Sequence, residues 1–526
     1  MAKRISRRDF LRGSAAGAAL VAMTGLTGAV ASAESEGTKD LVVSLSSSPS
    51  KLDPIHYTGT YEGQIIGEVC DRLIEYNDSL DEYVPSLAAS WEVSEDGLTY
   101  VFQIRDDVYF QTGTYQDGRQ MTVDDIVYSL NRSAEYSDNN RLSMLDYAEA
   151  TGDWEVTCHL TAANSAFMTA LTDAGNSIVP EEEVEGWGDD FGFHLIGTGP
   201  FYMTEFALDE YASLTANKSY WLKEPNLDTL TFRFITDTSQ SANAVLTGEV
   251  DIATDLTGEA ANTVTSSGTE DISLMQVEQL KIDYIRLNTT TGPTADINVR
   301  KALIMAVDWD AVVSALYPYG DAVRAYEPVP RGSWGYDSEL EELVLPYDPE
   351  GAKELLTEAG YPDGFSITFY VSNTAIRQTL ATVLQAYWAE VGVDCEVNIS
   401  EWGTFSDYAA SGTADVYGMS WTWYPDPYFF LNNLFASYNI GSNGNGANYS
   451  DPEVDDLLDK AAAATDQDER AEYYKEAMKI AMEAYSGSYY ATTILTYAVN
   501  NRVTDFAQRA DGTLRFVTEE HNVSVE

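Results

Sequence analysis

The sequence predicts an α/β protein with layered sheets and more than one domain. Segments with strand periodicity alternate with segments that carry helix signals, which is typical of layered α/β folds. Of the 526 residues, 44% are hydrophobic and 12% aromatic. This composition is that of a globular protein, and the chain is too long for a single core.

Strands are expected where apolar residues run together or alternate with polar ones. Alternation is clearest over residues 97–105, G-L-T-Y-V-F-Q-I-R, which predicts a half-buried strand. Residues 41–45, 230–235 and 365–371 are expected to form strands for the same reason.

Helix starts are signalled by capping residues. Thr122 and Asp125 have the spacing of a capping box ahead of an apolar run. Asp348 and Asp451 are each followed by proline and glutamate, which predicts an N-cap, a first-turn proline and a favourable acidic charge. Gly360 is placed to end the helix that begins after Asp348.

The first 33 residues predict an export signal. A basic start precedes an apolar run over residues 15–30, and the run ends in a small-residue cleavage pattern. The adjacent arginines Arg7 and Arg8 indicate the twin-arginine route. A membrane-spanning helix is the alternative, but the run is short and rich in glycine. We expect an extracytoplasmic protein, in a periplasm or cell envelope, and no lipid-attachment cysteine marks the cleavage site.

The charge is strongly acidic. There are 84 acidic and 30 basic side chains, with a net charge of −54. Such a surface repels nucleic acid and anionic lipid, so no nucleic-acid partner is expected. The acidic residues are scattered along the chain, which favours a role in solubility over one defined cation site.

Motifs for bond chemistry are largely missing. There is no zinc, P-loop, dinucleotide or nucleophile-elbow motif, and the histidines and cysteines are isolated, so neither a metal nor a cofactor is expected. Ser48 and Lys51 fit S-x-x-K, and residues 137–139 fit S-D-N, both found in penicillin-binding enzymes. However, K-T-G is missing, and Ser48 lies in a Ser/Pro-rich loop. An exported serine hydrolase remains an alternative to a binding protein. A Cys70–Cys158 disulfide is left open.

A series of short motifs follows from Leu52 onward. They are P-x-L-A-x-x-W at 85–91, D-G-L-T-Y at 96–100, G-T-G-P-F at 197–201, N-x-x-Y-W at 217–221, G-E-V-D at 248–251 and V-R-K-A-L at 299–303. In these motifs and their order the chain resembles the extracytoplasmic solute-binding proteins of peptide, nickel and opine ABC importers, family 5, and within it the dipeptide- and oligopeptide-binding proteins.

The resemblance implies a two-lobed periplasmic-binding-protein fold with two hinge strands, one at Lys281–Leu287 and one near 494–499. It also implies a monomer that encloses a small peptide or similar solute by hinge closure. Its expected partners are the permease and ATPase subunits of an importer. The implied parts are a signal peptide (1–33), lobe I (34–283, with an inserted subdomain at about 75–200), lobe II (284–496) and a return to lobe I (497–526).

The first candidate binding segment is Tyr57, Thr58, Gly59, Thr60 and Tyr61. It lies where peptide-binding relatives offer a lobe I edge to the backbone of the ligand, which is recognition by strand addition. Gly59 would permit close approach, and the threonine hydroxyls could donate hydrogen bonds. An ordinary surface turn is the alternative.

The second segment contains Trp421, Trp423, Tyr424 and Asp426 in lobe II. Relatives carry W-x-x-D here, and that aspartate takes the α-ammonium of the ligand, but in this chain the position is Tyr424. An enclosed ammonium without a counter-charge costs on the order of several kcal/mol. Either Asp426 or another nearby acid replaces the missing partner, or the ligand lacks a free N-terminus. The three aromatic residues are expected to stack against the ligand.

Two further candidates come from the resemblance. Arg377 lies within a residue or two of an arginine that pairs with the ligand carboxylate in dipeptide-binding relatives. Trp402 is a weaker candidate on the same lobe. A binding protein for a nickel chelate or haem with the same fold is an alternative, although the scarcity of histidine argues against direct capture of a metal.

Overall fold

The computed structural model describes residues 38–57, 59–138, 140, 142–422, 424–441 and 444–526. The predicted signal peptide therefore lies outside the described residues, as do Thr58 and Trp423. Residues Lys39–Glu526 form one compact unit. Within the described ranges, no helix is both long and apolar enough to cross a membrane.

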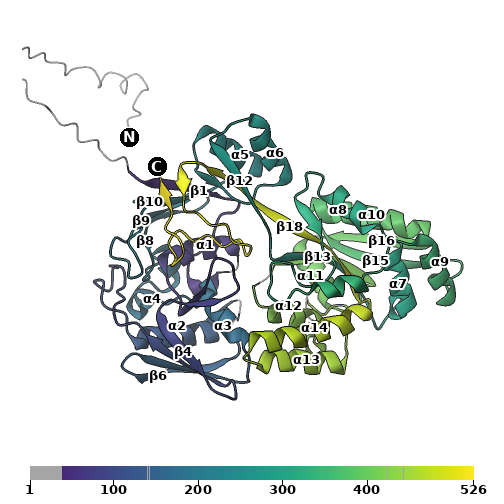
Figure 1. Ribbon diagram of the computed structural model, residues 1–526, viewed down its shortest axis with the longest axis horizontal. Coiled ribbons are helices and arrows are strands. Elements are labelled where there is room, and N and C mark those ends of the chain that lie inside the picture. Colours follow the sequence, from purple (N-terminus) through teal and green to yellow (C-terminus); the bar gives the residue numbers. More distant parts are fainter. Residues whose placement is uncertain (1–37, 58, 139, 141, 423, 442–443) are drawn as a thin grey trace, which may run out of the picture. The chain divides into compact units, whose positions relative to one another are not determined.

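The largest sheet is mixed and contains twelve strands in the described chain (Figure 1). They are β1 (Asp40–Leu45), β8 (Phe201–Ala207), β9 (Tyr211–Ala216), β10 (Thr229–Phe234), β11 (Ile252–Ala253), β12 (Ile272–Glu278), β13 (Lys281–Leu287), β14 (Ala322–Arg324), β15 (Phe365–Ser372), β16 (Val393–Ser400), β17 (Val416–Thr422) and β18 (Gly487–Asn500). The order is β16-β15-β17-β13-β18-β11-β1-β10-β9-β8, and β12 and β14 pair with β18. The strands predicted over 41–45, 230–235 and 365–371 are confirmed as β1, β10 and β15.

Strand β18 belongs to both lobes. Gly487–Ala491 pair with β13, whereas Ile494–Asn500 pair with β12. Residues 279–280 join β12 to β13, so the strand that pairs with β18 changes there and near residue 494. The lobe boundaries at 283 and 496 stay predictions. The two strands coincide with the predicted hinge strands, and their hinge motion stays a prediction.

A separate four-stranded antiparallel sheet lies within the predicted inserted subdomain. Its order is β4-β5-β7-β6, with β4 (Ala88–Val93), β5 (Thr99–Ile104), β6 (Leu145–Gly152) and β7 (Glu155–Leu160). Helix α2 (Val123–Tyr136) begins with the predicted capping box of Thr122 and Asp125. A hairpin of β2 (Ile74–Tyr76) and β3 (Tyr83–Pro85) precedes this sheet, and an apolar core of its own fills the subdomain.

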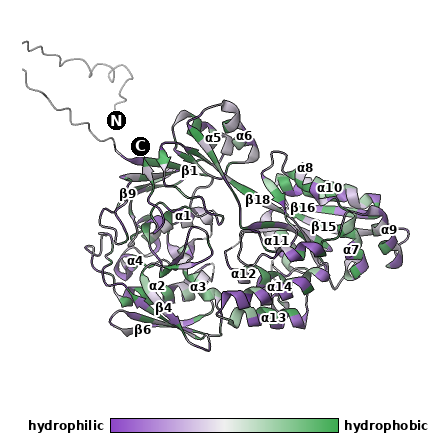
Figure 2. Cartoon of the chain, in the orientation of Figure 1, coloured by the Kyte–Doolittle hydropathy of each residue, from purple (hydrophilic) through white to green (hydrophobic). Residues whose placement is uncertain are grey.

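The remaining helices cover the sheets. They are α1 (Thr60–Val69), α3 (Ala166–Leu171), α4 (Glu181–Trp187), α5 (Thr238–Thr247), α6 (Gly258–Ser267), α7 (Ile297–Met305), α8 (Trp309–Leu316), α9 (Pro349–Glu358), α10 (Ala375–Glu390), α11 (Trp402–Ala410), α12 (Tyr428–Phe435), α13 (Pro452–Ala463) and α14 (Gln467–Glu483). Figure 2 shows α13 largely purple and β18 green, as expected of a surface helix and a buried strand. A short pair, β19 (Val503–Thr504) and β20 (Ser524–Val525), ties down the C-terminus.

The predicted helix caps are confirmed. The side chains of Asp348 and Asp451 accept hydrogen bonds from the first turns of α9 and α13. Gly360 follows α9 with a φ of +92°, a conformation that glycine adopts without strain. The cysteines are buried and free, so the Cys70–Cys158 disulfide that the sequence left open is not formed.

Candidate ligand-binding site

A cavity of about 380 Å³ lies between the two lobes. Lobe I supplies the residues before and within the start of α1, the loop around Asp173, and the C-terminal return at 509–515. Lobe II supplies Trp421 at the end of β17 and Tyr424 in the loop that follows this strand. We call this space the interlobe cavity. Of the predicted site residues, Tyr57, Gly59, Thr60, Trp421 and Tyr424 line it.

Asp173 joins the two lobes at this cavity. Its carboxylate accepts hydrogen bonds from the hydroxyl of Tyr57 at 2.6 Å and from that of Tyr424 at 2.5 Å. It also caps a short 3-10 helix through the N–H of Gly175 at 2.8 Å. A side chain at position 175 would lie 2.9 Å from the ring of Tyr57, so glycine allows the tyrosine to reach Asp173. Sequence reasoning missed Asp173.

The predicted extended edge over residues 57–61 is wrong in part. Helix α1 begins at Thr60 with Gly59 as its N-cap, so Thr60 and Tyr61 are helical and cannot pair with a ligand strand. The hydroxyl of Tyr61 is hydrogen-bonded to Ser46 at 2.6 Å, outside the lining of the cavity. Burial and the charge of Asp255 raise the pKa of Tyr61 to about 12. Only the residues before α1 are left for the predicted strand addition, which stays a prediction.

Asp426 does not line the interlobe cavity, contrary to the expectation that it could receive an ammonium. It is fully buried and forms an ion pair with Arg470 at 2.8 Å. Its other oxygen accepts a hydrogen bond from the N–H of Tyr428 at 2.9 Å. The Asp426 charge is thus already balanced inside the protein.

Arg377 is also placed away from the cavity, which corrects its expected contact with a ligand carboxylate. It is 6% exposed and pairs with Asp283 on β13 at 2.7 Å. A second nitrogen donates to the hydroxyl of Tyr490 at 2.6 Å. Burial opposes ionisation of Asp283, but Arg377 and Lys281 outweigh it and hold the pKa of this carboxyl below its usual value. Trp402 is 56% exposed on α11 and lines no part of the cavity.

Three arginines that the sequence analysis missed line the interlobe cavity: Arg72, Arg509 and Arg515. Arg515 donates to a carboxylate oxygen of Glu75 at 2.8 Å, and Arg72 pairs with the same oxygen. Burial raises the pKa of Glu75 to about 7, although Arg72 and Arg509 act in the opposite direction. Arg515 stands between Leu514 and Phe516, an apolar setting that predicts a buried arginine, and this signal could have identified it.

No metal centre is formed by the described residues, since none of their His, Cys, Asp and Glu side chains gather in groups of three that could hold an ion. His56, His159 and His521 each face a single carboxylate, and His194 stacks on Trp187. Ser48 lies in a loop, where its hydroxyl accepts a hydrogen bond from the N–H of Asp209 at 3.1 Å. It is not at a helix start, which the acyl-enzyme alternative required.

Comparison with known proteins identifies the family. Residues 82–442 match the family model described as bacterial extracellular solute-binding proteins, family 5 Middle. The chain belongs to this family. Residues 4–24 match the model of the twin-arginine translocation signal sequence. The protein is therefore an extracytoplasmic solute-binding protein with a twin-arginine export signal, as the sequence predicted.

The names of two relatives state different ligands. The dipeptide-binding protein of Escherichia coli is 31% identical over 497 residues, which cover 88% of this chain and 90% of that protein. Heme-binding protein A of Haemophilus influenzae is 30% identical over 441 residues, covering 78% and 79%.

Solved structures show the two-lobed fold. HbpA2 from Haemophilus parasuis matches with a TM-score of 0.84 and 29% identity, over 93% of this chain and all of that chain. The periplasmic binding protein DppA from Helicobacter pylori, in complex with the peptide STSA, matches with a TM-score of 0.75 and 26% identity, over 93% and 98% of the two chains. The predicted fold class is confirmed.

Proposed function

We propose that this solute-binding protein captures short peptides with a free N-terminus in the interlobe cavity and delivers them, as a monomer and without bond chemistry, to the permease of an ABC importer. The observation that carries this proposal is the cavity's distribution of charge. Asp173, whose carboxylate accepts hydrogen bonds from Tyr57, Tyr424 and the N–H of Gly175, is the negative pole. Arg509 and Arg515, on the C-terminal return, offer a positive one. A zwitterion matches both poles.

Closure of the lobes is part of the proposed mechanism. Tyr424 of lobe II reaches Asp173 of lobe I, so the site is complete only when the lobes are together. A peptide ammonium would bind at Asp173 beside the two tyrosine hydroxyls, as a charge-assisted contact. Trp421 would cover the peptide from lobe II. Membrane subunits could then distinguish the loaded protein by the two lobes that it presents together.

The test compares two aspartates. Asp173→Asn is expected to weaken binding of a mixed di- and tripeptide library by about 10- to 100-fold, the value of a charge-assisted hydrogen bond. The N-acetylated library should bind equally to Asp173→Asn and the wild type, measured by calorimetry. Asp426→Asn is the control, because its partner is Arg470, and it should not discriminate between the two libraries. Equal losses for both libraries in Asp173→Asn would remove the ammonium role.

Haem is a second candidate ligand, favoured by the likeness to heme-binding protein A of Haemophilus influenzae. Its two propionates could use the same arginines, Arg72, Arg509 and Arg515. Titration with hemin, followed in the visible absorbance spectrum, separates the two candidates. Saturable binding at one hemin per chain that peptides do not displace would favour haem, and binding of peptides alone would favour the first proposal.

A further inference from the structure

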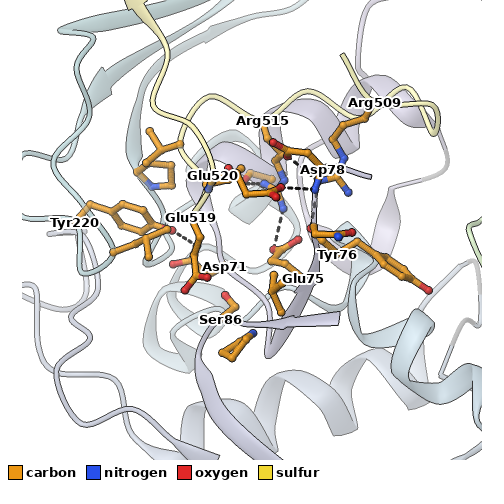
Figure 3. A pocket seen from close by; sticks show the side chains of 18 of the residues that line it. Asp71, Glu75, Tyr76, Asp78, Ser86, Tyr220, Arg509, Arg515, Glu519 and Glu520 are labelled. Atoms are coloured by element: carbon orange, nitrogen blue, oxygen red, sulfur yellow. Dashed lines mark hydrogen bonds and ion pairs between the residues drawn. The ribbon is translucent and has the colours of Figure 1, made fainter. Parts of the chain in front are cut away.

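A second cavity, of about 190 Å³, lies within lobe I and shares a wall with the interlobe cavity (Figure 3). Gly67, Glu75, Tyr76, Arg509 and Arg515 line both spaces. Figure 3 shows Arg515 above Glu75, joined to it by a dashed line. Glu75 and the two arginines therefore form a charged partition that faces the interlobe cavity on one side and the second cavity on the other.

Arg509 of this partition and the neighbouring Arg72 each have a donor without a partner among the described residues. Arg509 is 4% exposed and its Nε has no hydrogen-bond partner among the described residues. Its nearest carboxylates, those of Asp511 at 3.5 Å and Asp78 at 3.8 Å, are at the limit of hydrogen bonding or beyond it. The Nε of Arg72, which is 1% exposed, also lacks a partner in this part of the chain. Because buried donors without acceptors are costly, this wall favours an incoming anionic group.

Glu75 already occupies the best acceptor position. One of its oxygens is shared by Arg72 and Arg515. The charged groups that face it come from three places: Glu68 on α1, Asp71 and Arg72 before β2, and Arg509 and Arg515 on the C-terminal return. Burial and Asp71 raise the pKa of Glu75 to about 7, although the arginines lower it. The ionised and the neutral forms of Glu75 are therefore both populated near neutral pH.

We infer that Glu75 is an internal counterion that a ligand carboxylate replaces: the ligand binds Arg509 and Arg515, and Glu75 takes up one proton from solvent and remains as a neutral acid. The inference rests on the proposed function and adds to it a proton that is bound together with the peptide. Two carboxylates at one guanidinium group repel each other, so that one of them is favoured in its protonated form. Glu75 is the one that burial disfavours as an anion.

The direction of the pH dependence follows from linkage. Below about pH 7 Glu75 is already neutral in the empty protein, so its protonation does not reduce the affinity for the ligand. Above that pH each binding event must bring a proton. The dissociation constant of a free-acid peptide is therefore expected to rise by up to about tenfold per pH unit above pH 7. A C-terminally amidated peptide brings no carboxylate and should not show this rise.

The experiment is calorimetric titration at pH 7.5 of the full mature protein with Ala-Ala, in phosphate and in Tris, whose ionisation enthalpies differ. The wild type should take up most of one proton more than Glu75→Gln does with the same peptide, and this comparison cancels the titration of the peptide's own ammonium. Glu82→Gln is the control. Glu82 is exposed and lines the second cavity but not the interlobe cavity, so this variant should keep the uptake that the wild type shows.

Two outcomes would overturn the inference. Ala-Ala could bind the wild type and Glu75→Gln with the same proton uptake, which would leave the proposed function intact and remove the role of Glu75. If Glu75→Gln does not fold, Ala-Ala and its C-terminal amide are compared on the wild type, and equal uptake for both has the same meaning. Absence of binding by any member of the peptide library would overturn the proposed function and the inference together.

Discussion

Two kinds of buried arginine contrast within this molecule. Arg377 and Arg470 are each paired with an aspartate at hydrogen-bonding distance, and further nitrogens of both reach a hydroxyl or a carbonyl oxygen. Arg72 and Arg509 lie at cavities and keep nitrogens without partners among the described residues. A buried arginine that is fully paired stabilises the fold, whereas one that has an unused donor and also lines a cavity can receive a ligand.

The largest expected effect comes from breaking a fully paired arginine. Arg377→Met leaves Asp283 buried without its cation and should lower the free energy of unfolding by about 3–5 kcal/mol, measured by urea denaturation. Peptide affinity of the folded fraction should be unchanged. The double variant Arg377→Met/Asp283→Leu is the control and should recover part of the loss, because no unpaired charge remains. A stable Arg377→Met that no longer binds peptides would restore the ligand role that the resemblance implied.

The sequence was sufficient for most of the fold. Caps at Thr122, Asp348 and Asp451 act over three or four residues, and strand periodicity is equally local, so both can be read from the chain. The ordered family motifs gave the two lobes. The prediction of an extended edge over residues 57–61 was wrong in part. Helix α1 begins at Thr60 without a side-chain cap, so no capping residue in the sequence indicated a helix start there.

The site was less predictable, because contacts between distant segments decide which charged side chains are paired inside the protein and which line the cavity. The resemblance led us to expect Asp426 and Arg377 at the ligand, yet their partners Arg470 and Asp283 lie 44 and 94 residues away in the sequence. Asp173 becomes a site residue only when Tyr57 and Tyr424, far apart in the chain, meet at its carboxylate. No local pattern encodes such a meeting.

A smaller effect is expected in the pH dependence of stability, where Glu327, which has no ion pair among the described residues, differs from Asp283, which pairs with Arg377. Glu327 is fully buried, and one of its oxygens has no partner among the described residues. Burial raises the pKa of Glu327 to about 9, with Asp337 and Glu341 adding to the rise. The folded protein therefore holds a proton that the unfolded chain loses above about pH 4.5, so this group's contribution to stability falls as pH rises through that window. Asp283, with its lowered pKa, acts in the opposite direction and loses its contribution in acid.

The measurement is the free energy of unfolding at pH 6 and pH 8. Relative to Glu327→Gln, the wild type should lose about 2–3 kcal/mol between these two values. Glu342→Gln, a neighbouring exposed glutamate, is the control and should follow the wild type. Parallel pH profiles for the wild type and Glu327→Gln would mean that Glu327 is ionised in the folded protein and has found a partner.

The smallest effect is expected at a tryptophan that the sequence proposed for the site. Trp402 is more than half exposed, and its ring centre lies 5.7 Å from that of Phe405 in a tilted arrangement. Trp402→Ala should change the free energy of unfolding by less than about 0.5 kcal/mol and leave peptide affinity unaltered. Trp421→Ala, which removes a ring from the cavity wall, should weaken peptide binding by about tenfold. If both variants lose affinity equally in a calorimetric titration, the peptide extends beyond the interlobe cavity to α11. If neither does, the cavity between Asp173 and the arginines is not where the peptide lies.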